Sequence, residues 1–314
     1  MGDVTNFRCL IFDTETTNII QKEKQADGTT KTIMPRVIQL GYVVYDTSNP
    51  ENAKIYDKLI NISEDVEISE GAAKVHGITK ESIRDAPTDK KVTIEEALRE
   101  FLHDAKECKY IVAHNIVFDR SVLLSEIRHL PDGDLKTEGL ALFDTFTSGE
   151  NWTCTMQKNI NVCKLQSLKQ RELDEKLVRQ GKEPKNYYKF PKLSETYKHY
   201  FHYEPNEAAL HDAIIDVILC VRVFVRYMTG KDICGSNGVI TDYIKRITPD
   251  DFNINSNCPV PDDSSVILRG GRRTRRRKYR PYLKKGTTQN KKKTKKRKNK
   301  TKKRKKRNTK RRNK

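Results

Sequence analysis

The sequence contains no C-x-x-C pair, and its seven cysteines are an odd number. This argues against a zinc ribbon and against a framework of disulfide bonds, and it favours a reducing intracellular compartment. No stretch approaches the roughly 18 consecutive apolar residues of a membrane helix, and no charged segment followed by an apolar run stands near Met1. We therefore expect neither a membrane span nor a signal peptide.

Acidic residues are absent from the last part of the chain. Of the 62 lysines and arginines, 28 lie in residues 269–314, which contain no aspartate or glutamate. Residues 1–268 therefore carry 34 basic and 42 acidic residues, a formal net charge of −8, although the whole chain is at +20. A low-complexity basic segment cannot bury a core, so we expect residues 269–314 to be disordered and to meet a polyanion, most often nucleic acid. Such Lys/Arg runs are also typical of a nuclear import signal, so a nuclear location is an open alternative.

Residues 9–17 read C-L-I-F-D-T-E-T-T, four apolar positions that lead into two carboxylates. The pattern predicts a buried strand that ends with Asp13 and Glu15. Because alternate side chains of a strand share a face, both carboxylates point the same way. Neighbouring carboxylates repel each other, and a cation between them relieves that repulsion. An isolated D-x-E more often only faces water, so the metal interpretation depends on the rest of the chain.

Two further acidic positions follow apolar elements. A short strand at residues 110–113 leads to a helix for which Asn115 is the expected N-cap, which places Asp119 in or near the first turn. A long helix is expected from residue 208 onward, with His211 at its start and Asp216 about one turn inside. A helix N-terminus would help to keep that histidine neutral. Taken singly, each residue has an ordinary structural explanation.

In this order, the motifs D-x-E, H-N-x-x-F-D and H-D-x-x-x-D resemble those of the DEDDh family of 3′–5′ exonucleases. This DnaQ-like, RNase T-like group includes the proofreading (epsilon) subunit of bacterial DNA polymerase III. The segments V-H-G-I-T at residues 75–79 and P-R-V-I-Q-L-G at residues 35–41 are similar to the same family, and the resemblance covers about residues 7–229. It implies an α/β fold of the ribonuclease H-like type, in which helices flank a mixed β-sheet.

The resemblance also implies a role for each motif residue. Asp13 would bridge two divalent cations, Glu15 and Asp216 would ligate one of them, Asp119 would hold the second partly through water, and His211 would be the general base. Carboxylate oxygens suit Mg²⁺ or Mn²⁺, and two ions roughly 3.5–4 Å apart can activate a water and neutralise charge on phosphate. A neutral imidazole, with an ordinary pKa of about 6.5, can take the proton of that water.

Substrate-binding positions are expected within the same motifs: Thr14, Thr16, His76, Ile78 and Asn115. His114 and Asp212 also lie inside the motifs and are given structural or orienting roles. The sequence departs from the family pattern at Asn18, where a glycine is common, and in the insertion that follows. These departures bear on substrate preference.

We expect an exonuclease domain over residues 1–232, an irregular linker over residues 233–268 and then the tail. Residues 131–190 are expected to be a basic insertion that mixes lysine and arginine with aromatic residues, namely Trp152, Tyr187, Tyr188 and Phe190. Such a mixture suits a surface for single-stranded nucleic acid. A solvated helical insertion with a few core anchors is the alternative.

The sequence thus predicts a metal-dependent 3′–5′ exonuclease that hydrolyses phosphodiester bonds at the 3′ end of single-stranded DNA or RNA. The alternative is a nucleic-acid-binding or packaging protein with an idle nuclease domain. The filled catalytic positions favour activity. A module recruited by a polymerase, or by another replication or repair partner, is compatible with either. DNA and RNA present the same phosphates, so the motifs do not choose between them.

Overall fold

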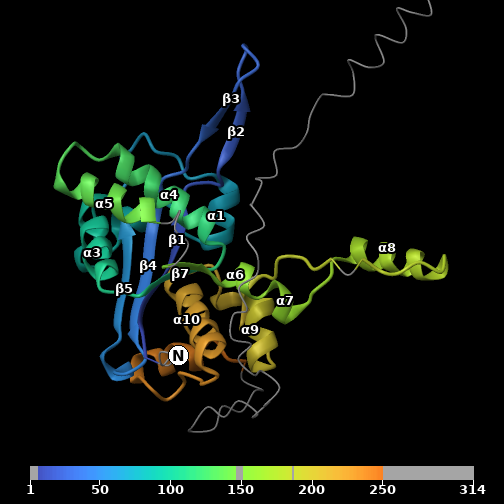
Figure 1. The fold of residues 1–314 in the computed structure, drawn as a ribbon. Coiled ribbons are helices and arrows are strands. Elements are labelled where there is room, and N and C mark those ends of the chain that lie inside the picture. Colours follow the sequence, from blue (N-terminus) through green and yellow to red (C-terminus); the bar gives the residue numbers. More distant parts are fainter. Residues whose placement is uncertain (1–5, 146–150, 186, 250–314) are drawn as a thin grey trace, which may run out of the picture. The chain divides into compact units, whose positions relative to one another are not determined.

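The computed structural model describes residues 6–145, 151–185 and 187–249, so the expected basic tail, residues 269–314, lies outside the described residues. The described part is built on a six-stranded mixed sheet in the order β6-β5-β4-β1-β7-β8 (Figure 1). Its strands are β1 (Arg8–Thr16), β4 (Val37–Asp46), β5 (Lys54–Ile60), β6 (Lys91–Val92), β7 (Tyr110–Ala113) and β8 (Trp152–Cys154). The fold is therefore the mixed α/β arrangement that the sequence predicted.

Strands β1, β4 and β5 form an antiparallel meander. Strand β1 pairs with β4, and β4 pairs with β5, in both cases antiparallel. Strand β7 joins β1 in parallel, and β8 and β6 extend the two edges in parallel. Strand β4 is buried along almost its whole length, because helices cover both faces of the sheet.

Helices α3 (Ile94–Lys106) and α4 (Ile116–His129), with α5 (Asp134–Asp144) packed on them, cover one face, whereas α10 (Ala213–Thr229) covers the other (Figure 1). The alternation of side chains along β1 divides the core accordingly. Leu10 and Phe12 pack with α3 and α4, and Cys9 and Ile11 pack with α10. Further helices are α1 (Glu70–His76), α2 (Lys80–Asp85), α6 (Thr155–Lys158), α7 (Ile160–Cys163), α8 (Leu168–Arg179), α9 (Leu193–Phe201) and α11 (Gly238–Ile247), with short 3-10 turns at Pro50–Asn52, Thr88–Lys90 and Glu207–Ala209.

Turn and cap residues stand where the elements begin and end. The polar excursion after β1 is a hairpin of β2 (Gln21–Lys24) and β3 (Thr30–Ile33), and Gly28 in its turn has a φ of +83°. Thr93 begins α3 and Thr79 begins α2, and each makes a capping box. Gly77 ends α1 in the left-handed conformation that glycine adopts without strain.

The expected irregular linker over residues 233–268 is wrong for residues 238–247, which form α11. The Asn237 side chain accepts a hydrogen bond from the N–H of Ile240 and caps this helix. Ile240, Ile244 and Ile247, spaced as one face of a helix, are fully buried. The folded body therefore extends beyond residue 232, because this apolar face packs against the core next to α10.

Residues 131–190 are not an insertion throughout, which corrects the second domain expectation. Strand β8 extends the main sheet beside β7. Trp152 on β8 is only 6% exposed and packs against Phe12 and Phe143. Trp152 is therefore a core residue and does not belong to a nucleic-acid surface.

Among the described cysteines, free thiols are carried by Cys9, Cys108, Cys154, Cys163 and Cys220, whereas Cys234 is disulfide-bonded. A single such bond does not amount to a disulfide framework, and the cellular compartment stays a prediction. Within the described ranges, none of the helices has both the length and the apolar character that crossing a bilayer requires.

Candidate active site

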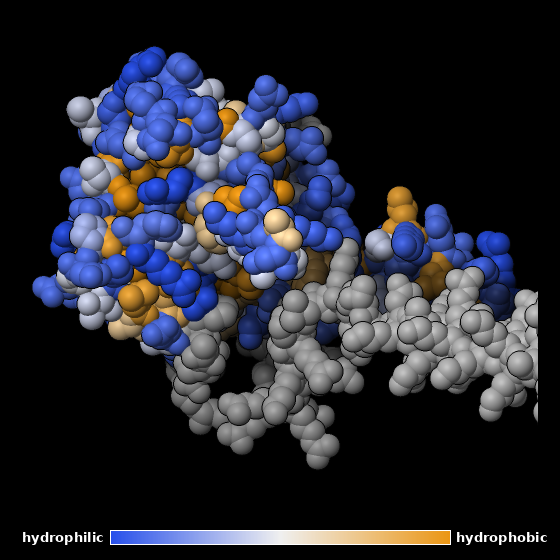
Figure 2. Space-filling model, turned by 90° about the horizontal axis from the view of Figure 1, so that it is seen from above, coloured by the Kyte–Doolittle hydropathy of each residue, from blue (hydrophilic) through white to orange (hydrophobic). Residues whose placement is uncertain are grey.

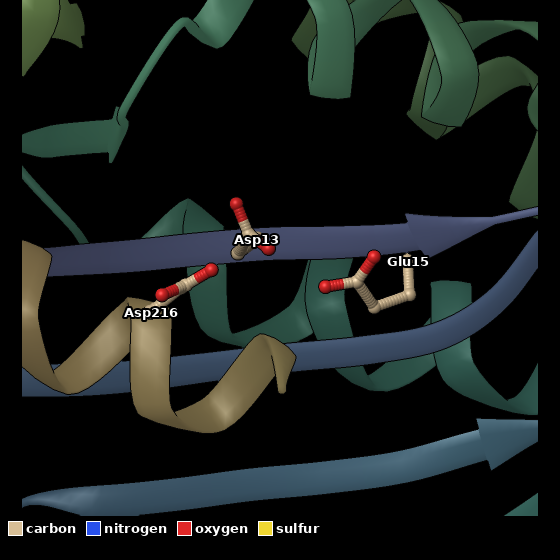
Figure 3. Close-up of side chains that lie close together, drawn as sticks. All are labelled: Asp13, Glu15 and Asp216. Carbon is tan, nitrogen blue, oxygen red and sulfur yellow. The ribbon is translucent and has the colours of Figure 1, made fainter. Parts of the chain in front are cut away.

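Three carboxylates meet on the face of the sheet that α10 covers. Asp13 and Glu15 come from β1, and Asp216 comes from the first turn of α10 (Figure 3). One carboxylate oxygen of each residue lies within 4.8 Å of the other two. The shared face of Asp13 and Glu15 is the one that strand alternation predicted. Three acids at this separation make a set of hard oxygen donors suited to a divalent cation.

A glycine on the neighbouring strand lets α10 come close enough to deliver Asp216. Gly41 of β4 lies directly opposite Asp13 in the strand register. A Cβ atom on Gly41 would come within 2.9 Å of the carbonyl carbon of Ala213 and of the backbone nitrogen of Ile214. Any other residue would push the start of α10 off the sheet and move Asp216 with it.

Asp119 lies in the first turn of α4 and is 3% exposed. Its Oδ1 accepts hydrogen bonds from the Thr14 backbone N–H at 3.2 Å and from the Thr14 hydroxyl at 2.8 Å. These bonds fix the carboxylate beside Thr14 of β1, and Asp119 is not one of the three acids grouped above. The charge of Asp119 still acts on Asp13 and raises its pKa.

The four carboxyls all resist ionisation. Removal from water, with added repulsion from the other three, raises the pKa of Asp13 well above its usual range. Removal from water and the charge of Asp216 raise the pKa of Glu15 to about 8. Burial raises the pKa of Asp216 to about 7, and it raises that of Asp119 to about 7 against the two Thr14 hydrogen bonds, which lower it. A bound cation would remove this conflict, because it favours the ionised form of each carboxyl.

His211 stands before α10 and not at its start, which corrects the sequence expectation. The chain forms a 3-10 turn at Glu207–Ala209, and α10 begins only at Ala213, with Asp212 as its N-cap. The Asp212 side chain accepts a hydrogen bond from the N–H of Ile214 and so caps the N-terminal end of α10. His211 itself is exposed and has a φ of +66°, the left-handed region.

The loop that holds His211 is tied to the acidic group. The backbone N–H of His211 bonds to the carboxylate of Asp216 and lowers its pKa. Asp216 is the fourth residue of α10, about one turn inside, as predicted. The histidine therefore lies next to the carboxylates although it is outside the helix.

The expected substrate-binding residues divide into two groups. His76 and Ile78 line a hollow of about 340 Å³, together with Asp212. Thr14 and Thr16 are buried, and their hydroxyls bond within the protein, to Asp119 and to the carbonyl of Asn18. The hollow is therefore the better candidate for substrate contact than the two threonine side chains.

Asn115 occupies the N-cap position of α4 but does not make the expected capping bond. Its φ is +65°, and its side chain accepts no hydrogen bond from the first turn. The side chain is exposed. Because the side chain is exposed and does not cap the helix, its amide can meet other partners.

His114 has the structural role that was expected. Its Nε2 lies 3.1 Å from the carbonyl of Pro191 and its Nδ1 lies 2.9 Å from the Thr155 hydroxyl. A carbonyl only accepts, so Nε2 carries the proton and Nδ1 accepts from the hydroxyl. Burial lowers the pKa of His114 to about 4. The histidines expected at the surface are exposed: His103, His129, His199 and His202.

Sequence reasoning missed Gln39 as a residue of the site. It lines the same hollow as His76 and bonds to Asp57, Asp212 and the backbone of Ala213. The one signal was its position in the P-R-V-I-Q-L-G segment, two residues before Gly41 on the same strand face. A polar residue in an otherwise apolar buried strand indicates a specific partner.

Comparison with known proteins gives a family match and weak structural similarities. A family model described as an exonuclease (RNase_T) matches residues 10–224. The structure of cell-death related nuclease 4 is 13% identical with a TM-score of 0.40, over 73% of this chain and 66% of that one. Exonuclease X bound to 5′-overhanging duplex DNA is 16% identical with a TM-score of 0.35, over 71% and 93%. E. coli exonuclease I in complex with a dT13 oligonucleotide is 16% identical with a TM-score of 0.44, over 76% and 43%.

This chain thus spans just under two thirds of cell-death related nuclease 4 and less than half of exonuclease I. No curated protein matches the sequence.

Proposed function

Because this chain belongs to the RNase_T exonuclease family, we propose that it removes nucleotides from the 3′ end of single-stranded DNA or RNA. Membership supports a nuclease, a hydrolase of phosphodiester bonds. The 3′–5′ direction, the strandedness of the substrate and the residue roles are the proposed part.

One observation carries the proposal: the meeting of Asp13, Glu15 and Asp216 beside His211. The three acids come from positions up to about 200 residues apart in sequence, on β1 and on α10. Burying like charges together is costly unless a cation or a substrate uses them. An idle domain would gain nothing from this arrangement, so the arrangement favours activity over the packaging alternative.

The residues present fit two divalent cations, Mg²⁺ or Mn²⁺. The donors are carboxylate oxygens, which these ions prefer, and no cysteine or imidazole is in the group. Asp13, Glu15 and Asp216 would hold the ions directly, and Asp119 would hold the second ion partly through water. The ions would supply charge neutralisation at the phosphate and a more acidic water.

The chain's own residues then orient and move a proton. His211, exposed at the edge of the group, would accept the proton of the attacking water. Its backbone N–H bonds to Asp216 and ties this part of the chain to the acids. His76 and Ile78, which line the neighbouring hollow, would contact the terminal nucleotide, and the exposed amide of Asn115 would contact its backbone.

A peripheral segment supports the choice of a single strand. This segment, residues 164–190 and hereafter the α8 arm, has eight basic and four acidic residues. Tyr187 and Phe190, at its C-terminal end, are 64% and 53% exposed. Exposed aromatic rings among positive charges suit unpaired bases, which can stack on them.

The test uses single strands of matched sequence in DNA and RNA, labelled at the 5′ or at the 3′ end. A 3′–5′ exonuclease releases the 3′ label at once as a mononucleotide and shortens the 5′-labelled strand stepwise. EDTA should stop the reaction, and excess Mg²⁺ or Mn²⁺ should restore it, whereas Ca²⁺ should support binding but little turnover. Asp13→Asn and Asp216→Asn, which keep side-chain size, should be inactive while folded.

Each part of the proposal has its own contrary result. Cleavage of a circular single strand would show an endonuclease. Early release of the 5′ label would reverse the direction. Undiminished hydrolysis in excess chelator would remove the two-ion mechanism. Binding without hydrolysis under any metal condition would favour the packaging alternative.

A further inference from the structure

A buried glutamine of β4 is bonded to the chain segment that carries His211. Gln39 is 7% exposed. Its Nε2 donates to the Oδ1 of Asp57 at 2.9 Å and to the Oδ1 of Asp212 at 3.2 Å. Its Oε1 accepts from the backbone N–H of Ala213 at 3.3 Å. Gln39 therefore links two strands of the sheet to the two residues that follow His211.

The partners determine which way the amide of Gln39 faces. Two carboxylates accept from its NH₂ group, and one N–H donates to its carbonyl. A flipped amide would set the carbonyl oxygen against the two carboxylates and the NH₂ group against the N–H of Ala213. The buried side chain thus uses its donors and its acceptor in one orientation only.

The backbone at His211 needs such a support. Its φ of +66° lies in the left-handed region, which is strained for a residue other than glycine. Strained conformations persist where the surroundings hold them. Asp212 and Ala213 come directly after His211, and the Gln39 amide bonds to both. Two positions further along β4, Gly41 gives the start of α10 the space to make this contact.

We propose that Gln39 is a positioning residue for His211. By holding Asp212 and Ala213 against β4, its amide sets where the imidazole stands relative to the three carboxylates. This inference rests on the proposed function, in which His211 accepts the proton of the attacking water. A misplacement of about 1 Å can cost about a hundredfold in rate, so loss of the amide should act on turnover.

The direct test is Gln39→Met, which keeps length and bulk but makes no hydrogen bonds. The kcat for removal of the 3′ nucleotide should fall about 10- to 100-fold, while KM should stay close to the wild-type value. Gln39→Glu keeps the shape but sets a third carboxylate beside Asp57 and Asp212, and its kcat should fall as well. Melting temperatures of both variants establish that they are folded, and either folded variant suffices for the test.

A double variant separates positioning from general stabilisation. In a His211→Ala background there is no imidazole to place, so adding Gln39→Met should lower kcat no further. If the effects of the two changes multiply, Gln39 does not act through His211 and the inference fails.

The matched control is Tyr42→Phe, on the same strand but the opposite face. It removes a buried hydrogen bond from the Tyr42 hydroxyl to Asp104, 2.7 Å long, and should lower the melting temperature with kcat retained. Wild-type protein with no nuclease activity would refute the proposed function. Active wild-type protein with an equally active Gln39→Met variant would refute the positioning role alone.

Discussion

At the scale of single residues, the site combines groups whose surroundings oppose their ordinary chemistry. Burial raises the pKa of Asp216 and of Asp119 to about 7, so these carboxyls keep their protons to a higher pH than usual. Burial lowers the pKa of His114 to about 4, so its imidazole stays neutral down to about that pH. The first effect favours a cation. The second fixes a neutral imidazole as a structural link. His211 differs from the buried carboxyls and from His114, because its side chain is exposed and its backbone is in the left-handed conformation.

The proton-accepting role of His211 makes a prediction for His211→Ala. Its kcat should fall by roughly 10²–10⁴-fold, with substrate binding nearly unchanged. At saturating Mg²⁺, wild-type activity should rise with pH as the base loses its proton, and the variant should lack this rise. The measurement is kcat against pH for both proteins.

His202 offers a matched control for that experiment. It is also exposed and has a φ of +64°, so alanine there tests the same kind of backbone conformation. His202→Ala should keep wild-type kcat at every pH. A His211→Ala enzyme within a few-fold of wild type would transfer the base role to another group.

His114 makes a prediction about stability in acid. Burial lowers its folded-state pKa to about 4, below the ordinary value of about 6.5 that applies when the chain is unfolded. The unfolded chain therefore binds the proton first, and stability is lost as pH falls from about 6.5 to about 4. The loss due to this residue is up to about 3 kcal/mol.

His114→Gln should remove that contribution, since a glutamine does not titrate. The free energy of unfolding should thus fall less steeply between about pH 6.5 and pH 4 in the variant than in wild type, as urea titrations at each pH can measure. His129→Gln, at an exposed position of α4, should follow the wild-type curve. Parallel curves for His114→Gln and wild type would show that His114 is not held neutral.

At the scale of elements, the α8 arm is held together by its own contacts. Asp174 is 6% exposed and accepts hydrogen bonds from Gln166, from Gln170 and from the backbone N–H of Lys185. At the base of the arm, Pro191 is the residue whose carbonyl bonds to His114. The arm is thus anchored to the segment that leads from β7 to Asp119.

The surface of the α8 arm carries both basic and apolar residues. Helix α8 projects outward, away from α7 and α9, in Figure 1, and apolar residues (orange) lie among hydrophilic ones on this segment in Figure 2. The exposed apolar residues of the helix are Leu168, Leu173 and Val178. Charge favours nucleic acid as its partner, whereas the apolar residues would suit a protein.

Neutralising three exposed charges of α8 decides between these partners. The triple variant Lys169→Gln, Arg171→Gln, Lys176→Gln should bind single-stranded nucleic acid more weakly and with a flatter salt dependence, by about 0.7 in log–log slope for each phosphate that it no longer neutralises. Its kcat at saturating substrate should stay near wild type. The measurement is affinity against salt concentration.

A second triple variant has the same change of charge elsewhere: Arg99→Gln, Lys106→Gln, Lys109→Gln, at exposed positions on and just after α3. It should keep the wild-type affinity and slope. Equal weakening in the two variants would mean that only net charge matters. Unchanged binding in both would leave the apolar residues of α8 as the feature that needs a partner.

At the scale of the whole molecule, charge is separated along the chain. Residues 1–268 are acidic and residues 269–314, outside the described part, hold 28 basic residues. An acidic body repels a polyanion at long range, and bound cations offset this only within a Debye length of about 8 Å. The basic segment can capture a strand through its phosphates without reading bases.

Truncation after Ser265 tests whether the basic segment captures nucleic acid while residues 1–265 carry out the reaction. The kcat on a short oligonucleotide should be nearly unchanged, because the segment supplies no group of the proposed active site. Binding to long nucleic acid should weaken, and its salt dependence should flatten, since fewer counterions are released. Affinity against salt for the full-length and truncated proteins is the comparison to make.

A version in which a Gly/Ser segment of equal length replaces residues 269–314 controls for chain length and should behave like the truncated protein. Equal salt slopes for all three proteins would exclude a nucleic-acid role for the basic segment. A nuclear import signal would then be the leading explanation of its charge.

Patterns among neighbouring residues were enough to predict the strand that ends with Asp13 and Glu15, the strand at residues 110–113 and the helix that follows it. Apolar runs and the alternation along β1 are local, so they also predicted the shared face of Asp13 and Glu15. The order of acidic motifs indicated the family that the match over residues 10–224 then showed.

The meeting of distant segments, in contrast, followed from the three-dimensional packing. Gln39 and Ala213 are 174 residues apart, and no local pattern states that β4 receives the start of α10 between Gln39 and Gly41. The apolar pattern predicted a helix from residue 208. The contact between β4 and Ala213, together with the cap at Asp212, makes α10 begin only at Ala213 and leaves His211 outside it. Trp152 became core because β8 had a free edge at β7 to join. The periods of helices and strands can be read from neighbouring residues. The contact of β4 with α10, the place of His211 and the burial of Trp152 depend instead on which apolar surfaces are still exposed, and which hydrogen-bonding groups are still unpaired, once the sheet has formed.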